Sequence, residues 1–485
     1  MVPTSNERPL VVDTAAFNDR LSEQTNATFT QRTIRRLSRS SPVKRFFRSS
    51  VSSEKNAAPS VFVEDTASVV ALPRDEEEAP KPEGIVEGGG DVYANDPAAA
   101  KFKSCAWWHV GFLMVAETIS LGILSLPAAI AKVGLIPGII SIIGLGILAT
   151  YSGYVIMQFK LAHPQTMSYA DVGVVMGGKW LGRFLGVAAV LSFVFIMAAH
   201  LLAFSVMMNV LTNHGTCSVV FGLIGTVVSI VLSLPRTSKD MSWISIISFF
   251  SISGAVMIVM IHLGIVREGG SSIQIIKDNA ELSPAVIGVL NIMLAFAGNT
   301  AFFGFIAELR DPREFPKALI MLQTIAMAIY LVVGVVIYYY VGGDVSSPAL
   351  TSAAPTIRKI SYGVAIPTIV VAGVINGHVA AKQLFTQYWI KRGQPAQCYA
   401  NTTKSWISWI TVLVGLWFFA WLLAEAIPIF EQLLGLVSAL FMSWFTYGLC
   451  GIMWIYMNRG SLTANWRKTS LFILNIVSCA RLVLP

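Results

Sequence analysis

Long apolar runs recur along this chain and constrain its fold more than any other feature. After residue 109, windows of roughly 17 to 30 mostly apolar residues follow one another with short polar breaks. Each window is long enough to cross the roughly 30 Å hydrocarbon core of a bilayer as a helix. Because lipid offers the backbone no hydrogen bonds, such runs fold as helices. We therefore predict an all-α polytopic membrane protein.

The runs give ten predicted spans in two sets of five. The first set lies near 110–130, 135–159, 184–211, 218–234 and 243–266, and the second near 286–306, 318–341, 364–385, 407–423 and 427–456. With five spans each, the halves enter the membrane from opposite sides, as in the inverted repeats of many transporters. A shorter apolar piece at 470–484 is predicted as an eleventh span or as a truncated last helix.

The composition supports a membrane protein and argues against other classes. Charged residues make up 13% of the chain, against about 25% in soluble domains. The net charge of +8 is spread over short loops, so no basic face is predicted to bind nucleic acid. The chain has no nucleotide-binding motif, which argues against coupling to ATP hydrolysis. Its five cysteines lack the spacing of metal ligands. We predict no cofactor and no metal site.

The first 104 residues are a different kind of sequence. A block at 32–48 carries seven positive charges, and a block at 54–96 carries eleven negative ones. Such a segment buries too little apolar area to offset the entropy of ordering, so we predict a disordered tail over 1–104 and a transmembrane domain over 105–485. Serines in the basic block suit phosphorylation, which predicts kinase or ubiquitin-ligase regulation. A solvated segment near anionic lipid is the alternative.

The placement of Lys and Arg predicts the orientation. With the tail inside, the inner loops carry fourteen basic residues and the outer loops five. Because short loops rich in Lys and Arg stay on the cytoplasmic side, the N-terminus is predicted to be cytoplasmic.

The first and sixth predicted spans each contain a polar stretch. Residues 117–127 read Glu-Thr-Ile-Ser-Leu-Gly-Ile-Leu-Ser-Leu-Pro, and 295–300 read Ala-Phe-Ala-Gly-Asn-Thr. Breakable backbone inside a membrane survives only beside a protein-lined cavity, and broken helices build the sites of secondary transporters. We predict a first helix broken between residues 120 and 125 and a sixth helix broken at the matching depth. A kinked packing helix is the alternative.

Two motifs resemble a known family. Residues 122–127, Gly-Ile-Leu-Ser-Leu-Pro, resemble the signature of the amino acid/auxin permease family, and residues 302–312, Phe-Phe-Gly-Phe-Ile-Ala-Glu-Leu-Arg-Asp-Pro, fit it as well. The closest likeness is to fungal neutral amino acid permeases, which share the Glu-Thr-Ile-Ser lead-in at 117–120. The resemblance covers about residues 105 to 480. It implies the five-plus-five inverted-repeat fold, eleven spans and amino acid uptake coupled to a cation.

A broken helix suits an amino acid because it exposes N–H groups at one end and C=O groups at the other. The N–H end matches the carboxylate and the C=O end matches the ammonium and a cation. The predicted carboxylate side comprises Ser120, Leu121, Gly122, Ile123 and Ser125. The predicted ammonium side and side-chain pocket comprise Phe296, Ala297, Gly298 and Asn299.

A carboxylate within a span is costly and marks a proton or ion path. Glu117 is therefore predicted to carry a coupling proton, with a hydrogen-bonded structural Glu as the alternative. His200 and Asn376 are further candidates for proton or cation coupling, and ordinary helix packing explains both equally well. Glu308 and Arg310 at the inner mouth are predicted to form an ion-pair gate, with solvated loop charges as the alternative.

These features predict a secondary active transporter that imports neutral aliphatic and aromatic amino acids by proton symport with alternating access. One proton charge crossing about 100 mV releases roughly 2.3 kcal/mol, enough for roughly fiftyfold accumulation of a zwitterion. The predicted location is the fungal plasma membrane. An amino acid sensor without net transport, sodium coupling and a vacuolar location remain open. No enzyme is predicted, because Asp344 lies in an outer loop without a second intramembrane Asp.

Overall fold

A computed structural model describes residues 105–481 except 237, 267–272, 278–280 and 399. The tail predicted for residues 1–104 lies outside the described residues. In the described part, every element of regular structure is a helix, and one isolated parallel bridge joins Cys105 to Leu309. The predicted all-α class is confirmed.

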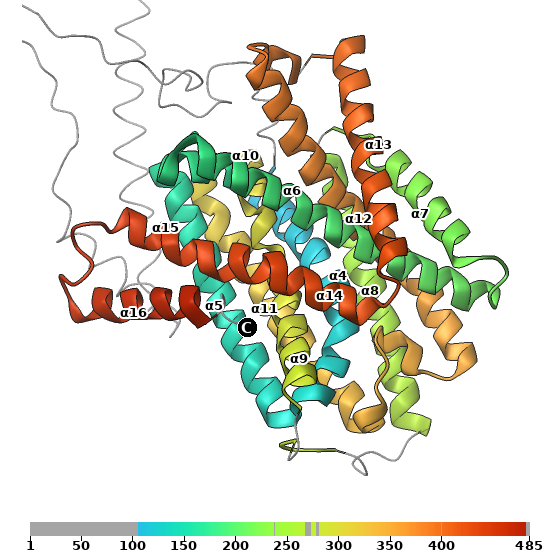
Figure 1. The fold of residues 1–485 in the computed structure, drawn as a ribbon. Coiled ribbons are helices and arrows are strands. Elements are labelled where there is room, and N and C mark those ends of the chain that lie inside the picture. The colour runs from blue at the N-terminus through green and yellow to red at the C-terminus, as the bar shows by residue number, and fades with distance from the viewer. Residues whose placement is uncertain (1–104, 237, 267–272, 278–280, 399, 482–485) are drawn as a thin grey trace, which may run out of the picture. The chain divides into compact units, whose positions relative to one another are not determined.

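Five helices form the first half of the transmembrane domain, one at each predicted span, and Figure 1 shows their arrangement. They are α4 (Trp107–Val133), α5 (Leu135–Ala162), α6 (Tyr169–Thr212), α7 (Ser218–Leu232) and α8 (Ser238–Val266). Helix α7 ends two residues before its predicted span does. At 44 residues α6 is longer than predicted, because a short arm precedes the span. The backbone leaves helical geometry at Gly177 and at Gly178, where φ is 81°.

The second half repeats the pattern of five. The sixth span consists of α9 (Leu282–Ala295), the 3₁₀ turn η1 (Ala297–Ala301) and α10 (Phe302–Glu308). Three long helices follow: α11 (Phe315–Val341), α12 (Pro355–Lys391) and α13 (Thr403–Ala426). The tenth span joins α14 (Phe430–Val437), the π-helical η6 (Ser438–Gly448) and α15 (Leu449–Met457). The short η2 (Pro312–Glu314), η3 (Gly342–Asp344), η4 (Ala349–Ser352) and η5 (Pro395–Cys398) lie in loops, and α16 (Trp466–Arg481) comes last.

Eight helices in the described ranges are long and apolar enough to cross a membrane, and α9 with η1 and α10 makes a ninth as a bent pair. Two others are short for a straight span, which needs about 20 residues: α7 has 15 residues and α16 has 16. The protein is therefore a polytopic helical membrane protein, and the count of ten or eleven spans stays a prediction.

The two predicted breaks differ in form. The sixth span bends by 46° between α9 and the pair η1 and α10, which confirms that break. In contrast, α4 is helical from Trp107 to Val133, so the polar stretch predicted to break the first span stays in a continuous helix. The Oγ of Ser120 donates to Glu117 O at 3.3 Å and that of Ser125 donates to Gly122 O at 3.1 Å. These local bonds keep the hydroxyls satisfied without unwinding the backbone.

Helix α4 is the central helix of the domain. Its most apolar stretch is wholly buried, whereas α5, α8, α11 and α13 leave many large apolar side chains exposed, as lipid-facing helices do. Small residues let its neighbours approach closely. A Cβ on Gly122 would lie 2.7 Å from the Tyr330 hydroxyl of α11 and 2.8 Å from Ala295 Cβ of α9. The middle of α4 is therefore held against both helices.

Candidate functional site

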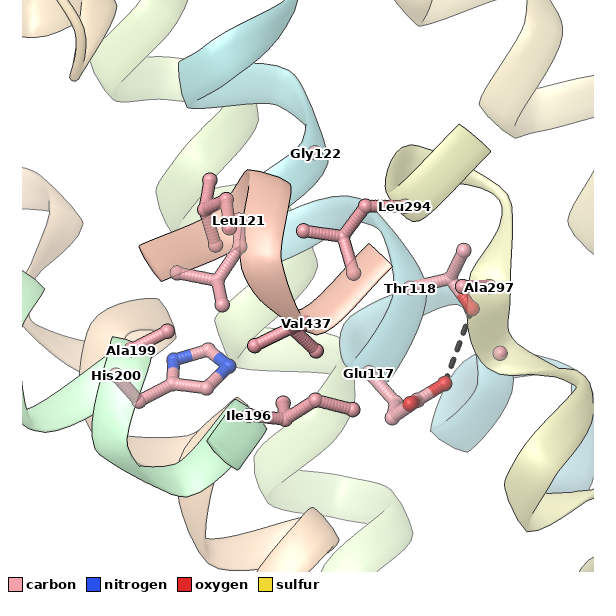
Figure 2. Close-up of a pocket in the computed structure, with 12 residues that line it drawn as sticks. Glu117, Thr118, Leu121, Gly122, Ile196, Ala199, His200, Leu294, Ala297 and Val437 are labelled. Atoms are coloured by element: carbon pink, nitrogen blue, oxygen red, sulfur yellow. Dashed lines mark hydrogen bonds between the residues drawn. The ribbon is translucent and has the colours of Figure 1, made fainter. Parts of the chain in front are cut away.

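A cavity lies against the middle of α4 (Figure 2). Residues of α4, α6, the bent sixth span and α14 line it. They are Glu117, Thr118, Leu121, Gly122, Ile196, Ala199, His200, Leu294, Ala297, Gly298, Leu434 and Val437. The cavity therefore joins the two polar stretches that the sequence singled out, one from each half of the domain.

The wall of this cavity is mainly aliphatic, with two titratable groups. Five large aliphatic side chains contribute to it, and Glu117 and His200 are the titratable residues of the lining set. The free volume is about 30 Å³, room for roughly two water molecules. An amino acid does not fit this volume, so its entry requires the aliphatic side chains to move apart.

Glu117 faces the cavity from α4 and is 8% exposed. Thr118 Oγ1 donates to Glu117 Oε2 at 3.1 Å, and the side chain of Asn376 on α12 also interacts with this carboxyl. No Lys or Arg of the described residues forms an ion pair with Glu117. A buried carboxyl without a cationic partner can take up a proton or bind a cation from the cavity.

His200 faces the cavity from α6, across from Glu117 (Figure 2). Its Nδ1 lies 3.1 Å from the carbonyl oxygen of Ile369 on α12. Because a carbonyl only accepts, Nδ1 carries the hydrogen and Nε2 is the acceptor in this arrangement. Ser120 Oγ lies 3.5 Å from Nε2. The imidazole is thus oriented to accept a hydrogen bond or a proton on the cavity side.

Tyr330 of α11 ties the two halves together next to the cavity. Its hydroxyl lies 2.9 Å from Thr118 O on α4 and 2.7 Å from Ala295 O on α9. One hydroxyl hydrogen is therefore shared between carbonyls of the first and sixth spans. Tyr330 is one of four tyrosines on α11, and nothing local in the sequence distinguishes it.

The structure brings six of the predicted site residues to the cavity wall: Glu117, Leu121, Gly122, His200, Ala297 and Gly298. Ser120 lies next to it, through its contact with His200. The remaining predicted substrate residues, Ile123, Ser125, Phe296 and Asn299, are buried outside the lining set.

Two of these buried residues pack against neighbouring elements. The ring of Phe296 meets that of Tyr330 edge-on, with centroids 5.2 Å apart. Asn299 Nδ2 donates to Thr446 O of η6 at 3.3 Å. Both contacts hold the bend of the sixth span in place.

Half of the residues that line the cavity were not predicted from the sequence. The missed residues are Thr118, Ile196, Ala199, Leu294, Leu434 and Val437. Five of them are apolar residues on apolar helices, where no pattern separates a cavity wall from a lipid-facing or core position. Thr118 could have been found, since it directly follows Glu117 in the polar stretch.

Two ion pairs lie toward opposite ends of α4. Glu308 of α10 pairs with Lys382 of α12 at 2.6 Å, and Lys132 near the end of α4 pairs with Glu431 of α14 at 2.7 Å. Cys105, just before α4, accepts from Arg310 N at 3.0 Å and donates to Glu308 O at 3.2 Å. From the helical rise, Glu117 lies about 15 Å from the start of α4 and about 22 Å from Lys132. The cavity therefore sits between the two pairs.

Comparison with known proteins identifies the family. Residues 103–484 match the family described as "Transmembrane amino acid transporter protein". The chain belongs to this family. It is 35% identical over 408 residues to the "N amino acid transport system protein" of Neurospora crassa, covering 81% of this chain and 86% of that protein. A "Transmembrane transporter" of Fusarium pseudograminearum is 28% identical over 374 residues, covering 76% and 78%.

Solved structures share the fold. A mutant manganese transporter of Eremococcus coleocola aligns with a TM-score of 0.54 at 12% identity, covering 81% of this chain and 88% of that one. MhsT in complex with L-phenylalanine aligns with a TM-score of 0.51 at 12% identity, covering 77% and 97%. At this identity the likeness concerns the fold alone, and it confirms the predicted inverted-repeat transporter architecture.

Proposed function

We propose that the protein imports neutral aliphatic and aromatic amino acids by proton symport, with alternating access to the cavity at α4. The observation that carries the proposal is Glu117, a buried carboxyl that faces a mainly aliphatic cavity at the centre of a transporter fold. The family supports an amino acid as the substrate. The aliphatic wall favours apolar side chains, and a zwitterion brings no net charge into it.

Substrate binding in this proposal begins with the opening of α4. The N–H groups of Ser120 to Ser125, proposed to hold the carboxylate, lie inside a continuous helix in the closed structure. The sixth span is already bent at Ala297 and Gly298, proposed to contact the ammonium. Gly122 lacks a side chain where α4 meets α9 and α11, so it is the natural point for α4 to open.

The proton is carried by Glu117 in this mechanism. The protonated Glu117 and a zwitterion cross inward together as a neutral pair, and the emptied protein returns with Glu117 ionised. Each cycle therefore moves a net charge of +1 inward, which the membrane potential favours. His200 Nε2 is a second acceptor for the proton or the substrate ammonium. Asn376 keeps the Glu117 carboxyl in position.

Sodium is the second candidate for the coupled cation. Asn376 Oδ1 is buried without a hydrogen-bond partner in the described part of the chain, and its side chain interacts with Glu117. Together with Thr118 Oγ1, these groups offer the oxygen ligands that a hard cation prefers.

The two ion pairs are proposed as the gates. Breaking the Lys132 and Glu431 pair opens the cavity toward the outside, and breaking the Glu308 and Lys382 pair opens it toward the cytoplasm. Of the two predicted gate residues, Glu308 forms the inner ion pair with Lys382, and Arg310 is its neighbour at the same mouth. This assignment follows the predicted orientation, with the N-terminus in the cytoplasm and the protein in the plasma membrane.

Uptake of labelled leucine and phenylalanine by permease-deficient yeast tests the proposal. Uptake that rises at acid pH without sodium supports proton symport, and uptake that requires sodium favours the second cation. Labelled substrate that binds purified protein without accumulating in proteoliposomes would contradict transport and support a sensor. Accumulation only in isolated vacuoles would place the protein in that membrane.

A further inference from the structure

Two exposed cations lie side by side on α6, just past its glycine break. Lys179 and Arg183 are four residues apart, one helical turn, and both are exposed. Neither forms an ion pair with another described residue. The sequence between residues 172 and 239 contains no Asp or Glu. Within the described residues, the positive charge at this end of α6 therefore has no ion-pair partner.

An apolar stripe begins at these cations. Trp180, Phe184, Val187 and Leu191 are 79%, 59%, 61% and 43% exposed. They recur at i, i+4, i+7 and i+11, which places them on one face of the helix. From Trp180 to Leu191 the helix rises about 17 Å, close to half of the roughly 30 Å hydrocarbon core. The stripe is thus about as long as one leaflet is thick.

The opposite face of the same stretch is packed against the protein. Gly182, Leu185, Gly186 and Ala189 are buried. A Cβ on Gly186 would lie 2.9 Å from Ala170 Cβ in the short arm that precedes the break. This packing fixes which face of α6 remains uncovered. Farther along, α6 carries Ile196 and His200 into the cavity.

We propose that this face of α6 binds an acidic phospholipid. The headgroup lies against Lys179 and Arg183, and an acyl chain follows the stripe from Trp180 to Leu191. A headgroup without net negative charge leaves both cations uncompensated, and a soluble anion leaves the stripe uncovered. Since α6 also carries His200, the bound lipid stabilises the helix that forms one wall of the cavity. The inference does not depend on the transported substrate.

The test compares lipid binding by the full-length protein and two double variants in phosphatidylcholine vesicles. Association of spin-labelled phosphatidylserine is measured relative to spin-labelled phosphatidylcholine. A cation at an anionic lipid surface contributes roughly fivefold in binding, so Lys179→Gln with Arg183→Gln is expected to lower the preference roughly tenfold or more. The matched control is Lys391→Gln with Lys404→Gln, which removes two exposed cations from α12 and α13. It is expected to leave the preference unchanged.

Three outcomes overturn the proposal. The wild-type protein could show no preference for the acidic lipid, or the control variant could lose the preference to the same extent. A cross-link between two copies through Trp180→Cys that displaces the labelled lipid would instead assign this face to contact between copies. An unchanged thermal unfolding midpoint in pure phosphatidylcholine shows that the Lys179 and Arg183 variant is folded, so that its loss of preference reports the lipid site.

Discussion

The first and sixth spans occupy equivalent places in the two halves, yet their polar stretches behave differently. In α4, Ser120 and Ser125 bond back to carbonyls of their own helix, which remains continuous. In the sixth span, α9 ends at Ala295 and the chain bends by 46° through η1. Serine hydroxyls can bond to the preceding turn, whereas glycine adds flexibility and supplies no such bond.

Because of this difference, the two spans present different groups to the cavity. The continuous helix presents a titratable side chain, Glu117, at a fixed position. The bent span presents backbone, and its Gly298 allows close contact with Glu117 and Thr118. In the proposed mechanism, the first half supplies the coupling carboxyl and the groups for the substrate carboxylate, and the sixth span supplies space and the groups for the substrate ammonium.

We expect the largest effect from neutralising Glu117, which α4 contributes to the contact between the two spans. Glu117→Gln keeps the shape of the side chain but cannot exchange a proton. We expect accumulation of labelled leucine in proteoliposomes with an imposed proton gradient to fall from roughly fiftyfold toward equilibrium. Thr118→Val, which removes only the hydrogen bond to Glu117, should retain accumulation. Equal loss in both variants would contradict the special role of the carboxyl.

Adding a methyl group at Gly298, on the sixth span, should impair uptake nearly as much. A Cβ on Gly298 would overlap Thr118 Oγ1 and lie 2.8 Å from Glu117 Oε2. Gly298→Ala is therefore expected to lower the rate of leucine uptake about tenfold, since a misplacement of about 1 Å in a site costs on that order or more. Gly304→Ala, whose Cβ would meet only Val379 at 3.9 Å, is the control. Normal uptake in the Gly298 variant would show that the contact does not position Glu117.

The link between the spans should affect stability more than rate. Tyr330→Phe leaves Thr118 O and Ala295 O without their shared hydroxyl, which costs about 2 kcal/mol for buried groups. The expected result is a lower thermal unfolding midpoint in detergent. Tyr339→Phe, on the same helix but 45% exposed, should leave the midpoint unchanged. Equal midpoints for wild type and Tyr330→Phe would remove this link from the account.

Much of the architecture was predictable from the sequence, because long apolar runs in lipid fold as helices. The broken sixth span followed from small and polar residues at 295–300, and Glu117 and His200 stood out because charged or titratable groups are rare inside spans. The continuity of α4 could not be predicted, since it depends on where Ser120 and Ser125 direct their hydroxyls. Ile196 and Val437 join the site through long-range packing, and neither differs locally from an ordinary apolar residue.

The smallest expected effect concerns the back-bonding that keeps α4 continuous. Ser125→Ala removes one hydroxyl bond to Gly122 O and is expected to change stability by about 0.5 kcal/mol. Uptake should remain near wild type. Hydrogen exchange of the α4 amides is the sharper measurement, because faster exchange near Gly122 in this variant would show that the serine restrains opening. Unchanged exchange would show that the Ser125 hydroxyl does not restrain the opening of α4.

Proton movement itself tests the central claim most directly. A pH-sensitive dye inside proteoliposomes reports acidification when leucine enters down its own gradient. We predict acidification with the wild-type protein and none with Glu117→Gln, while the variant still exchanges labelled for unlabelled leucine. Acidification by the Glu117→Gln protein at the wild-type rate would contradict the claim that this carboxyl carries the coupled proton.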